Sequence, residues 1–307
     1  VSGDIESFKQ NDTVTITASA GISGISRVEV KKDDGSYNDI TSAYISGYTV
    51  TENGTYIFRI TNGANLKATD SITYTKLDSA KPVVSIDSND YIQDTWTNGD
   101  VTLTVSNTAS NLGTTTFQYS TDNANWSSYT GAITIGSDTN TTYYFKAISA
   151  AGVESNVESI VVKLDKTAPT GEITVKTKGF TSFLNTITFG LFFKNTIGIT
   201  VLSADSGSTV DAVEYYLSET ALDNTTDWTS IGWTVGDSTS VTANWKGVVY
   251  ARITDKAGNV SIINSDGIVV YTDSGAAASA SFIKNSIFDL SVPVEMNGNT
   301  VKSVSYG

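Results

Sequence analysis

Hydrophobic and polar residues alternate in three well-separated stretches of the chain. In segment 12–19, Val14 and Ile16 alternate with threonines, and segments 100–106 and 195–205 repeat the pattern. A period of two is typical of a β-strand with one face against a core and one face in water. The hydrophobic positions of the two later segments are Val101, Leu103 and Val105, and then Ile197, Ile199 and Val201. These patterns predict antiparallel sheets with one threonine-rich face.

Turn signals separate the predicted strands at intervals of roughly 8–12 residues, a rhythm typical of a β-sandwich. They are Asp34-Gly35, Asn53-Gly54, Asn98-Gly99 and Ala257-Gly258-Asn259. No segment has the pattern of an amphipathic helix, and we expect at most a short helical turn over 181–187. The most hydrophobic run, 187–193, is interpreted as a buried strand because it is too short to span a membrane.

The chain also repeats itself. The segment Lys76-Leu77-Asp78 followed by Pro82 recurs, at a constant offset, as Lys163-Leu164-Asp165 followed by Pro169. A second motif is centred on Tyr56, Tyr143 and Tyr250, and each copy leads into a turn and a final strand. Its first two copies have the same offset as the proline-containing segments, and the third copy follows after a longer interval. Repetition of this kind indicates a tandem array of similar domains.

The two proline-containing segments mark the domain boundaries. Each leaves about four residues between one domain and the next, and proline restricts the backbone there. We predict an all-β protein of tandem immunoglobulin-like β-sandwich domains in an extended array. The expected domains are residues 1–78, 79–166 and 167–274, followed by a linker and an incomplete domain at 275–307.

The joint "KLDKTAP", the Tyr-x-Phe strand and the Ala-Gly-Asn turn resemble bacterial Ig-like repeats of Firmicutes surface and secreted proteins. Within the third repeat, Phe180–Glu219 resembles an Ig-like repeat of large cell-wall proteins of gut Clostridia. The resemblance covers residues 1 to about 274. It implies the fold and an extracellular location, either wall-attached or secreted. It does not select a function, because such repeats occur in adhesins, enzymes and spacers alike.

The stretch 275–307 is different. After a linker of small residues, "SFIKN" and "DLSVPVEMNGNTVKSV" resemble the opening of an X2 module, an Ig-like domain found beside carbohydrate-active catalytic domains. A whole module needs roughly 80–100 residues to bury a sandwich core, so we expect only part of one here. Pro293 departs from the family pattern and indicates an edge strand or a bulge.

Composition narrows the function classes. The 307 residues contain 45 Thr and 38 Ser but no Cys and no His, and the net charge is −13. The missing residues exclude disulfides, thiolate nucleophiles, Cys-based metal sites and the Ser-His-Asp triad. The negative charge argues against nucleic acid and anionic membranes as partners. We expect a monomer without membrane insertion.

Paired carboxylates are the catalytic class that this composition leaves open. Asp87, Asp90 and Asp94, or Glu214 and Glu219, are candidates, but short sandwich repeats leave no room for a deep pocket, so we predict no catalytic residues and no enzyme. The first three also crowd near a domain joint, where carboxylates can bind Ca²⁺. The spacing is not that of an EF-hand, and ordinary Asx turns are the alternative. Apart from calcium, no cofactor is expected.

Surface aromatic side chains could stack on sugars, and Trp126 and Trp233 are the candidates for glycan binding. Ig-like sandwiches also bury aromatic residues in their cores, so both interpretations stay open. We expect a non-catalytic stalk or adhesin segment of a cell-surface protein that presents a distal domain. Its expected partner is an extracellular glycan or a host or cell-wall surface. The alternative is an accessory region of a secreted carbohydrate-active enzyme.

Overall fold

The computed structural model describes residues 1–176, 191–193, 196–223, 225–242, 244–265, 267–270, 294–296 and 299–301. In these ranges the regular elements are β-strands and two short 3-10 helices, Gly21–Ser23 and Tyr44–Ser46. The all-β prediction is therefore confirmed. No described helix is long and apolar enough to cross a membrane. The helical turn predicted over 181–187 lies outside the described residues.

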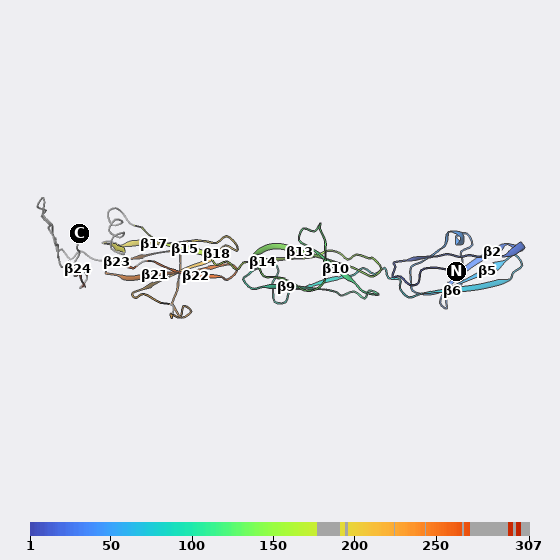
Figure 1. The fold of residues 1–307 in the computed structure, drawn as a ribbon, viewed down its shortest axis with the longest axis horizontal. Helices are drawn as coiled ribbons and strands as arrows, with labels where there is room; N and C mark the ends of the chain where they lie inside the picture. The colour runs from blue at the N-terminus through green and yellow to red at the C-terminus, as the bar shows by residue number, and fades with distance from the viewer. Residues whose placement is uncertain are drawn as a thin grey trace. The chain divides into compact units, whose positions relative to one another are not determined.

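Contacts divide the chain into two compact units, residues 1–95 with 100–162 and residues 96–99 with 163–307. Apart from a separate hairpin within 294–301, the described strands form three pairs of sheets (Figure 1). We refer to these pairs as the first, second and third sandwich. The predicted boundary at 78 lies inside the first unit, and the one at 166 lies just after the division at 162. The three-domain division at these residues stays a prediction.

The first sandwich pairs a two-stranded sheet, β1–β4, with a four-stranded sheet, β3–β2–β5–β6. Its strands are β1 (Asp12–Val14), β2 (Ile25–Lys32), β3 (Asn38–Asp39), β4 (Tyr48–Val50), β5 (Gly54–Asn62) and β6 (Lys67–Tyr74). Both sheets contribute to one core of Val14, Ile16, Val28, Val30, Val50, Tyr56, Phe58, Tyr74 and Leu77. The predicted alternation is confirmed, because Val14 and Ile16 are buried while Thr13 and Thr15 are exposed.

The second sandwich pairs the sheet β11–β10–β13–β14–β8 with the sheet β12–β9–β7. Its strands are β7 (Val84–Asp87), β8 (Trp96–Thr97), β9 (Val101–Asn107), β10 (Thr116–Ser120), β11 (Ser127–Tyr129), β12 (Ile133–Ile135), β13 (Thr139–Ile148) and β14 (Glu158–Leu164). Val101 and Leu103 from β9 are buried, as are Phe145 and Ala147 from β13.

The third sandwich pairs the sheet β15–β17–β20 with the sheet β16–β23–β21–β18–β19, and β22 also pairs with β21. Its strands are β15 (Thr170–Lys176), β16 (Leu191–Phe193), β17 (Ile197–Ala204), β18 (Val210–Ser218), β19 (Thr234–Val235), β20 (Ser238–Val241), β21 (Lys246–Asp255), β22 (Val260–Asn264) and β23 (Ile268–Val270). Ile197, Ile199 and Val201 are buried as predicted. Part of the expected strand 187–193 is described, as β16.

In each sandwich a segment near its N-terminal end runs parallel to the last strand or, in the first sandwich, to the residues just after it. Lys9 pairs with Leu77 in the first sandwich, β8 pairs with β14 in the second, and β16 pairs with β23 in the third. The other strand pairings of the three sandwiches whose residue register is defined are antiparallel. Two facing sheets with this order form an immunoglobulin-like β-sandwich, and the chain contains such sandwiches in tandem.

In 275–307 the structure describes one antiparallel hairpin, β24 (Val294–Met296) with β25 (Asn299–Val301). The predicted linker, the segment "SFIKN" and Pro293 lie outside the described residues. The resemblance of this stretch to an X2 module therefore stays a prediction.

The third copy of the tyrosine motif is not in the register that the sequence suggested. In the second sandwich a turn is closed by the hydrogen bond from the Ser149 N–H to the Val153 carbonyl. The equivalent turn of the third sandwich is closed by the bond from the Asp255 N–H to the Asn259 carbonyl. With the turns aligned in this way, Tyr143 is equivalent to Val249 and not to Tyr250. Tyr250 lies on the opposite face of its strand, with its ring 5.4 Å from that of Trp228. A slip of one residue moves a side chain to the other face of a sheet.

Phe58 and Phe145 occupy equivalent positions in the first and second sandwiches and are 1% and 0% exposed. We predict that Phe58→Ala lowers the free energy of unfolding of the first sandwich by about 3–5 kcal/mol, because it leaves a cavity in a closed core. Phe145→Ala should do the same in the second sandwich. Hydrogen exchange measured by mass spectrometry would locate each loss, to β2 and β5 in one variant and to β10 and β13 in the other. Equal losses in both sandwiches from either variant would contradict this prediction.

Candidate functional site: a charged sheet face and a carboxylate cluster

The predicted calcium ligands lie on the surface of the second sandwich. The side chains of Asp87, Asp90 and Asp94 are exposed, and Asp87 Oδ1 accepts a hydrogen bond from the Asn89 N–H at 2.9 Å. That bond is an Asx turn, which is the alternative that the sequence left open. Asn89 and Asp94 both have positive φ angles, of 53° and 65°. Turn formation accounts for these residues, and calcium binding at them stays a prediction.

Trp126 is half-buried in the second sandwich. The ammonium of Lys146, on β13, lies over its ring at 4.8 Å from the centroid, and Lys146 also pairs with Glu154 at 3.3 Å. The ring and the cation hold the loop between β10 and β11 against the sheet. Glycan binding at Trp126 stays a prediction.

Trp233 is half-buried in the third sandwich. Its Nε1 donates to the carbonyl oxygen of Trp228 at 3.1 Å, and the two indoles stack with centroids 6.2 Å apart. Tyr216 approaches its edge, and the guanidinium of Arg252 lies 5.0 Å from its centroid. These contacts make Trp233 part of an aromatic cluster on the outer face of the sheet, and glycan binding there stays a prediction as well.

These two tryptophans belong to a pattern that recurs in all three sandwiches. One strand carries a cation, and the strand beside it carries a hydrogen-bonding side chain at the paired position. The pairs are Glu29 with Arg59, Gln118 with Lys146, and Glu214 with Arg252. In each case the cation lies over an aromatic ring from the loop that follows the neighbouring strand, not the strand of the cation itself. The rings are Tyr37, Trp126 and Trp233. The sequence singled out two of these rings, and Tyr37 was missed.

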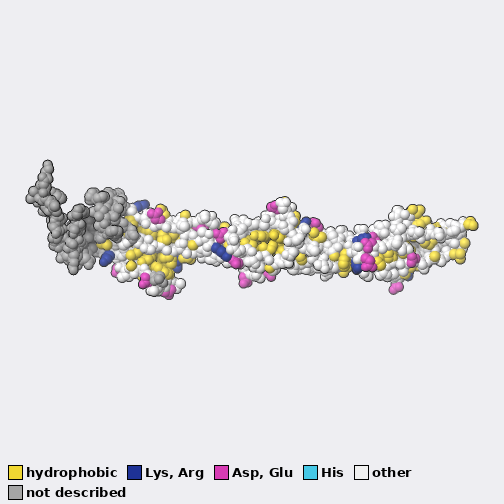
Figure 2. Space-filling model, viewed as in Figure 1, with side chains coloured by type: hydrophobic (Ala, Val, Ile, Leu, Met, Phe, Trp, Pro, Cys, Tyr) yellow, Lys and Arg dark blue, Asp and Glu magenta, His cyan; other side chains and the backbone are white. Residues whose placement is uncertain are grey.

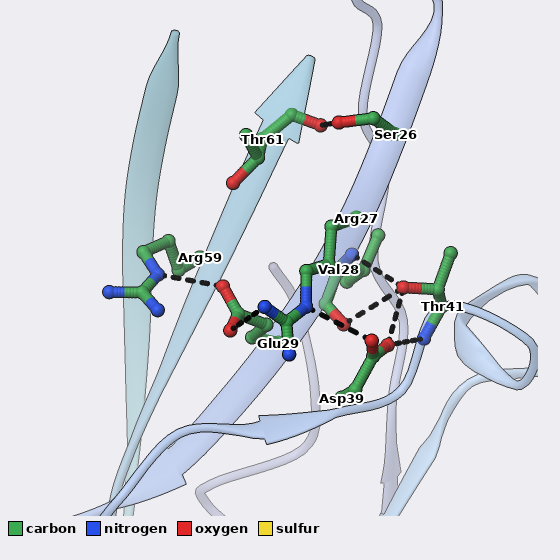
Figure 3. Close-up of polar contacts among 8 residues, drawn as sticks. All are labelled: Ser26, Arg27, Val28, Glu29, Asp39, Thr41, Arg59 and Thr61. Atoms are coloured by element: carbon green, nitrogen blue, oxygen red, sulfur yellow. Dashed lines mark hydrogen bonds and ion pairs between the residues drawn. The ribbon is translucent and has the colours of Figure 1, made fainter. Parts of the chain in front are cut away.

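In the first sandwich this pattern forms a network of charged side chains (Figure 3). Glu29 is 4% exposed and accepts a hydrogen bond from Arg59 Nε at 2.8 Å. Arg27 Nη1 lies 3.3 Å from the other oxygen of Glu29, and Arg27 Nε donates to Asp39 at 3.0 Å. The hydrogen bond from Arg59 lowers the pKa of Glu29 below its ordinary value despite the opposing effect of desolvation.

Tyr37 brings two cations together above this network. Its ring centroid lies 3.7 Å from the Arg59 guanidinium and 5.6 Å from the Lys31 ammonium. Cation–π attraction of this kind stabilises a loop against a sheet. In Figure 3 the two terminal nitrogens of Arg59 point away from Glu29. Within the described part of the chain, the hydrogen bond of Arg59 to Glu29 uses Nε and leaves these two nitrogens available.

The aspartates of the two repeated joints act as buried acceptors. Asp78 is 8% exposed and accepts from the N–H groups of Leu112 at 2.7 Å and Ala80 at 2.8 Å. Asp165 is fully buried and accepts from the N–H groups of Ser208 at 2.6 Å and Thr167 at 3.0 Å. Each carboxylate thus fixes its joint to a loop of the sandwich that follows.

Asp165 also belongs to a carboxylate cluster in the second unit. One oxygen from each of Asp165, Asp205 and Asp255 lies within 4.8 Å of the others, and Asp255 is 2% exposed. Asp205 lines a shallow cavity of about 220 Å³. Three carboxylates are the donor set of a hard cation such as Ca²⁺, so these residues could hold one. Acidic side chains gather at turns without an ion as well, and each of these carboxylates has backbone or amide donors.

The equivalent joint of the second sandwich does not have this cluster among its described residues. There the amide of Asn111 donates to Asp78 at 3.2 Å, and Ser149 takes the place of Asp255. The pKa of Asp78 is lowered, because hydrogen bonds from Leu112, Ala80 and Asn111 outweigh desolvation, which raises it. The two joints therefore differ, since one has a single carboxylate and the other has three.

No protein-family model matches the chain, and no curated protein matches it. The solved structures include three domains of the Hoc capsid protein of bacteriophage RB49, at 14% identity over 87% of this chain and 96% of that one, with a TM-score of 0.35. They also include fibronectin(III)-like modules of Clostridium thermocellum CbhA, at 14% identity over 66% of this chain and 100% of that one, with a TM-score of 0.29. Chicken CNTN1 FN1–FN3 domains match at 14% identity over 86% of this chain and 98% of that one, with a TM-score of 0.25. The order of the strands defines the immunoglobulin-like fold independently of these similarities.

The ion pair of Glu29 with Arg59 predicts an acid dependence confined to the first sandwich. Because the folded pKa of Glu29 lies below its ordinary value of about 4.5, which the unfolded chain retains, the pair stabilises the fold above that pH. The contribution is lost as the pH falls through the folded pKa. Arg59→Met should remove this part of the acid dependence, as measured by hydrogen-exchange protection of β2 and β5 at pH 7 and pH 3.5. The matched variant Arg252→Met should leave β2 and β5 unchanged, and an effect of both on these strands would contradict the assignment.

Loss of a hydrogen bond ordinarily lowers the free energy of unfolding. In the carboxylate cluster we predict that replacing one carboxylate raises it. In chelator-treated protein, Asp205→Asn should raise the free energy of unfolding of the third sandwich by about 1 kcal/mol, because it removes one of three like charges. Tryptophan fluorescence during urea unfolding would measure it through Trp228 and Trp233. A loss of stability would instead show that the acceptor role of Asp205 toward Thr209 outweighs the repulsion.

Proposed function

We propose that this chain is a non-catalytic, load-bearing spacer region of a bacterial protein that acts outside the cell. It would present another domain of the same protein at a distance from its attachment. A tandem module of immunoglobulin-like sandwiches is compatible with many functions, so the proposal depends on how the ends of each sandwich are held.

The observation that carries the proposal is that, in each sandwich, a segment near the N-terminal end pairs in parallel with a segment at the C-terminal end. In the first sandwich the Lys9 N–H donates to the Lys76 carbonyl at 3.2 Å, and the Asp78 N–H donates to the Lys9 carbonyl at 2.8 Å. In the second, the Asp165 N–H donates to the Thr97 carbonyl at 2.9 Å beside the β8–β14 pair. In the third, β16 and β23 form three consecutive pairs.

Tension along the chain acts on these pairs in a particular direction. An N-terminal segment is pulled toward its own start, and the last strand is pulled toward its own end. When the two are parallel, these forces point in opposite directions along the strand axis and load all the hydrogen bonds between them together. Antiparallel strands pulled from adjacent ends would instead separate one bond at a time. Parallel closure therefore favours resistance to stretching.

Further features support a spacer outside the cell. The joints are short, and Asp78 and Asp165 are buried acceptors that fix them to the next sandwich. The chain contains 45 Thr and 38 Ser, and hydrophobic and charged side chains occupy only parts of the face shown in Figure 2. The resemblance of the joint "KLDKTAP" to repeats of Firmicutes surface and secreted proteins supports a bacterial origin and a wall-attached or secreted location.

Single-molecule stretching from the two chain ends tests this proposal. We predict one high-force rupture for each sandwich, with a contour-length increase of roughly 25–35 nm for domains of about 80–100 residues at 3.3–3.6 Å per residue. Because the chain has no cysteine, handles can also be attached at chosen positions. Thr51→Cys with Thr75→Cys would pull apart the adjacent ends of β5 and β6, where Gly54 pairs with Tyr74.

This second geometry is the control, because it opens an antiparallel pair from one end. The first sandwich should rupture at a clearly lower force through the handles at positions 51 and 75 than when it is stretched from its own ends. Equal forces in the two geometries would contradict a load-bearing role of the parallel closure.

A further inference from the structure

The outer face of the sheet β2–β5–β6 in the first sandwich is built from rows of paired residues. Arg27 pairs with Thr61, which pairs with Lys67. The next row contains Glu29, Arg59 and Thr69, and the third contains Lys31, Ile57 and Ser71. Residues in neighbouring rows lie two positions apart on a strand and therefore share a face.

This face carries an excess of positive charge on an acidic chain. Its cations are Arg27, Lys31, Arg59 and Lys67. Its carboxylates are Glu29, the neighbouring Asp39, and Asp33, which accepts a hydrogen bond from the Thr55 N–H in the next row, so the excess is one positive charge. The whole chain has 19 basic and 32 acidic residues. At an ionic strength of about 0.15 M, the Debye length of about 8 Å screens distant acidic residues from a ligand that touches this face.

The cations at the equivalent positions of the other two sandwiches are electrically balanced by their described neighbours. Lys146 is paired with Glu154, and Gln118 beside it is neutral. Arg252 forms two hydrogen bonds to Glu214, at 2.6 and 2.8 Å. The cation over an aromatic ring therefore recurs as a structural feature. The uncompensated charge belongs to the first sandwich, so structural packing alone does not account for it.

The groups on this face also define what it can bind. Guanidinium groups here already hold carboxylates, since Arg59 binds Glu29 and Arg27 binds Asp39. The terminal nitrogens of Arg59 and the ammonium groups of Lys31 and Lys67 can hold further anionic oxygens. Tyr37 supplies an aromatic ring, and the exposed hydroxyls of Thr69 and Ser71 line the edge strand. Rings and hydroxyls suit sugars, whereas the cations suit acidic groups.

We propose that this face binds a polysaccharide that carries carboxylate groups, such as a polymer of uronic acids. The site goes beyond the spacer role, because a spacer needs no ligand, and it does not use Trp126 or Trp233. An acidic sugar polymer would place carboxylates on Arg59, Lys31 and Lys67 and sugar rings along Tyr37 and the hydroxyl row.

Binding of the full chain to immobilised polygalacturonate tests the proposal, with dextran as a neutral polysaccharide and polyphosphate as an anion without sugar. We expect binding to polygalacturonate and much weaker binding to the other two. Lys31→Glu with Lys67→Glu should weaken it roughly tenfold, since two charge contacts at the surface of the face are lost and reversed. Lys246→Glu with Lys256→Glu in the third sandwich is the matched control. It makes the same change in net charge and should leave the affinity unchanged.

Each other outcome would overturn part or all of the proposal. No binding to polygalacturonate, or equal weakening by both double variants, would overturn the site. Equal binding to polyphosphate would overturn the assignment of a sugar ligand, and equal binding to dextran would overturn the role of charge. If the double variant is unstable, Lys67→Gln on the exposed edge strand must still weaken binding. Stretching experiments are independent of all these results, so failure here leaves the spacer proposal standing.

Discussion

The period of two along each strand is the constraint on which this structure depends. It places Val28, Val30 and Phe58 in the first core and thereby leaves Arg27, Glu29 and Arg59 together on the opposite face. Burial of hydrophobic side chains at roughly 25 cal/mol per Å² fixes which face is inside. The charged network does not choose the register, because surface ion pairs contribute about 0–1 kcal/mol each. The core sets the register, and the register then determines which side chains lie next to one another on the outer face.

The same constraint explains what the sequence could predict. Val14 and Ile16, or Val101 and Leu103, alternate with polar residues over several positions, so their strands and buried faces were evident without coordinates. The slip at Tyr250 was not evident, because a tyrosine beside a valine satisfies either register in the sequence. The structure resolves it through the turn at Asp255. Register depends on contacts between strands, which a motif of a few residues does not contain.

The candidate sites differ from the predictions for a related reason. Asp87, Asp90 and Asp94 are close in sequence, yet closeness along a loop produces an Asx turn as readily as a ligand set. Asp165, Asp205 and Asp255 are far apart in sequence, and only the return of successive strands to one end of the sandwich brings them together. In all three sandwiches the cation over the ring lies on a later strand, so Trp126 and Trp233 stood out only as tryptophans and nothing in the sequence marked Tyr37.

Comparison of the repeats separates what the fold requires from what one repeat has added. A buried acceptor at the joint is required, since Asp78 and Asp165 both accept backbone N–H groups from the following loop. A cation over an aromatic ring is also common to all three sandwiches, which indicates a role in holding the loop. In the described parts of the chain, the two extra acids beside Asp165 and the unbalanced cations around Arg59 are each confined to one repeat. The other repeats fold without these features, so folding does not require them, and their side chains are available to bind a ligand. That is the physical basis for assigning function to the outer face of the first sandwich, while the shared features are assigned to stability.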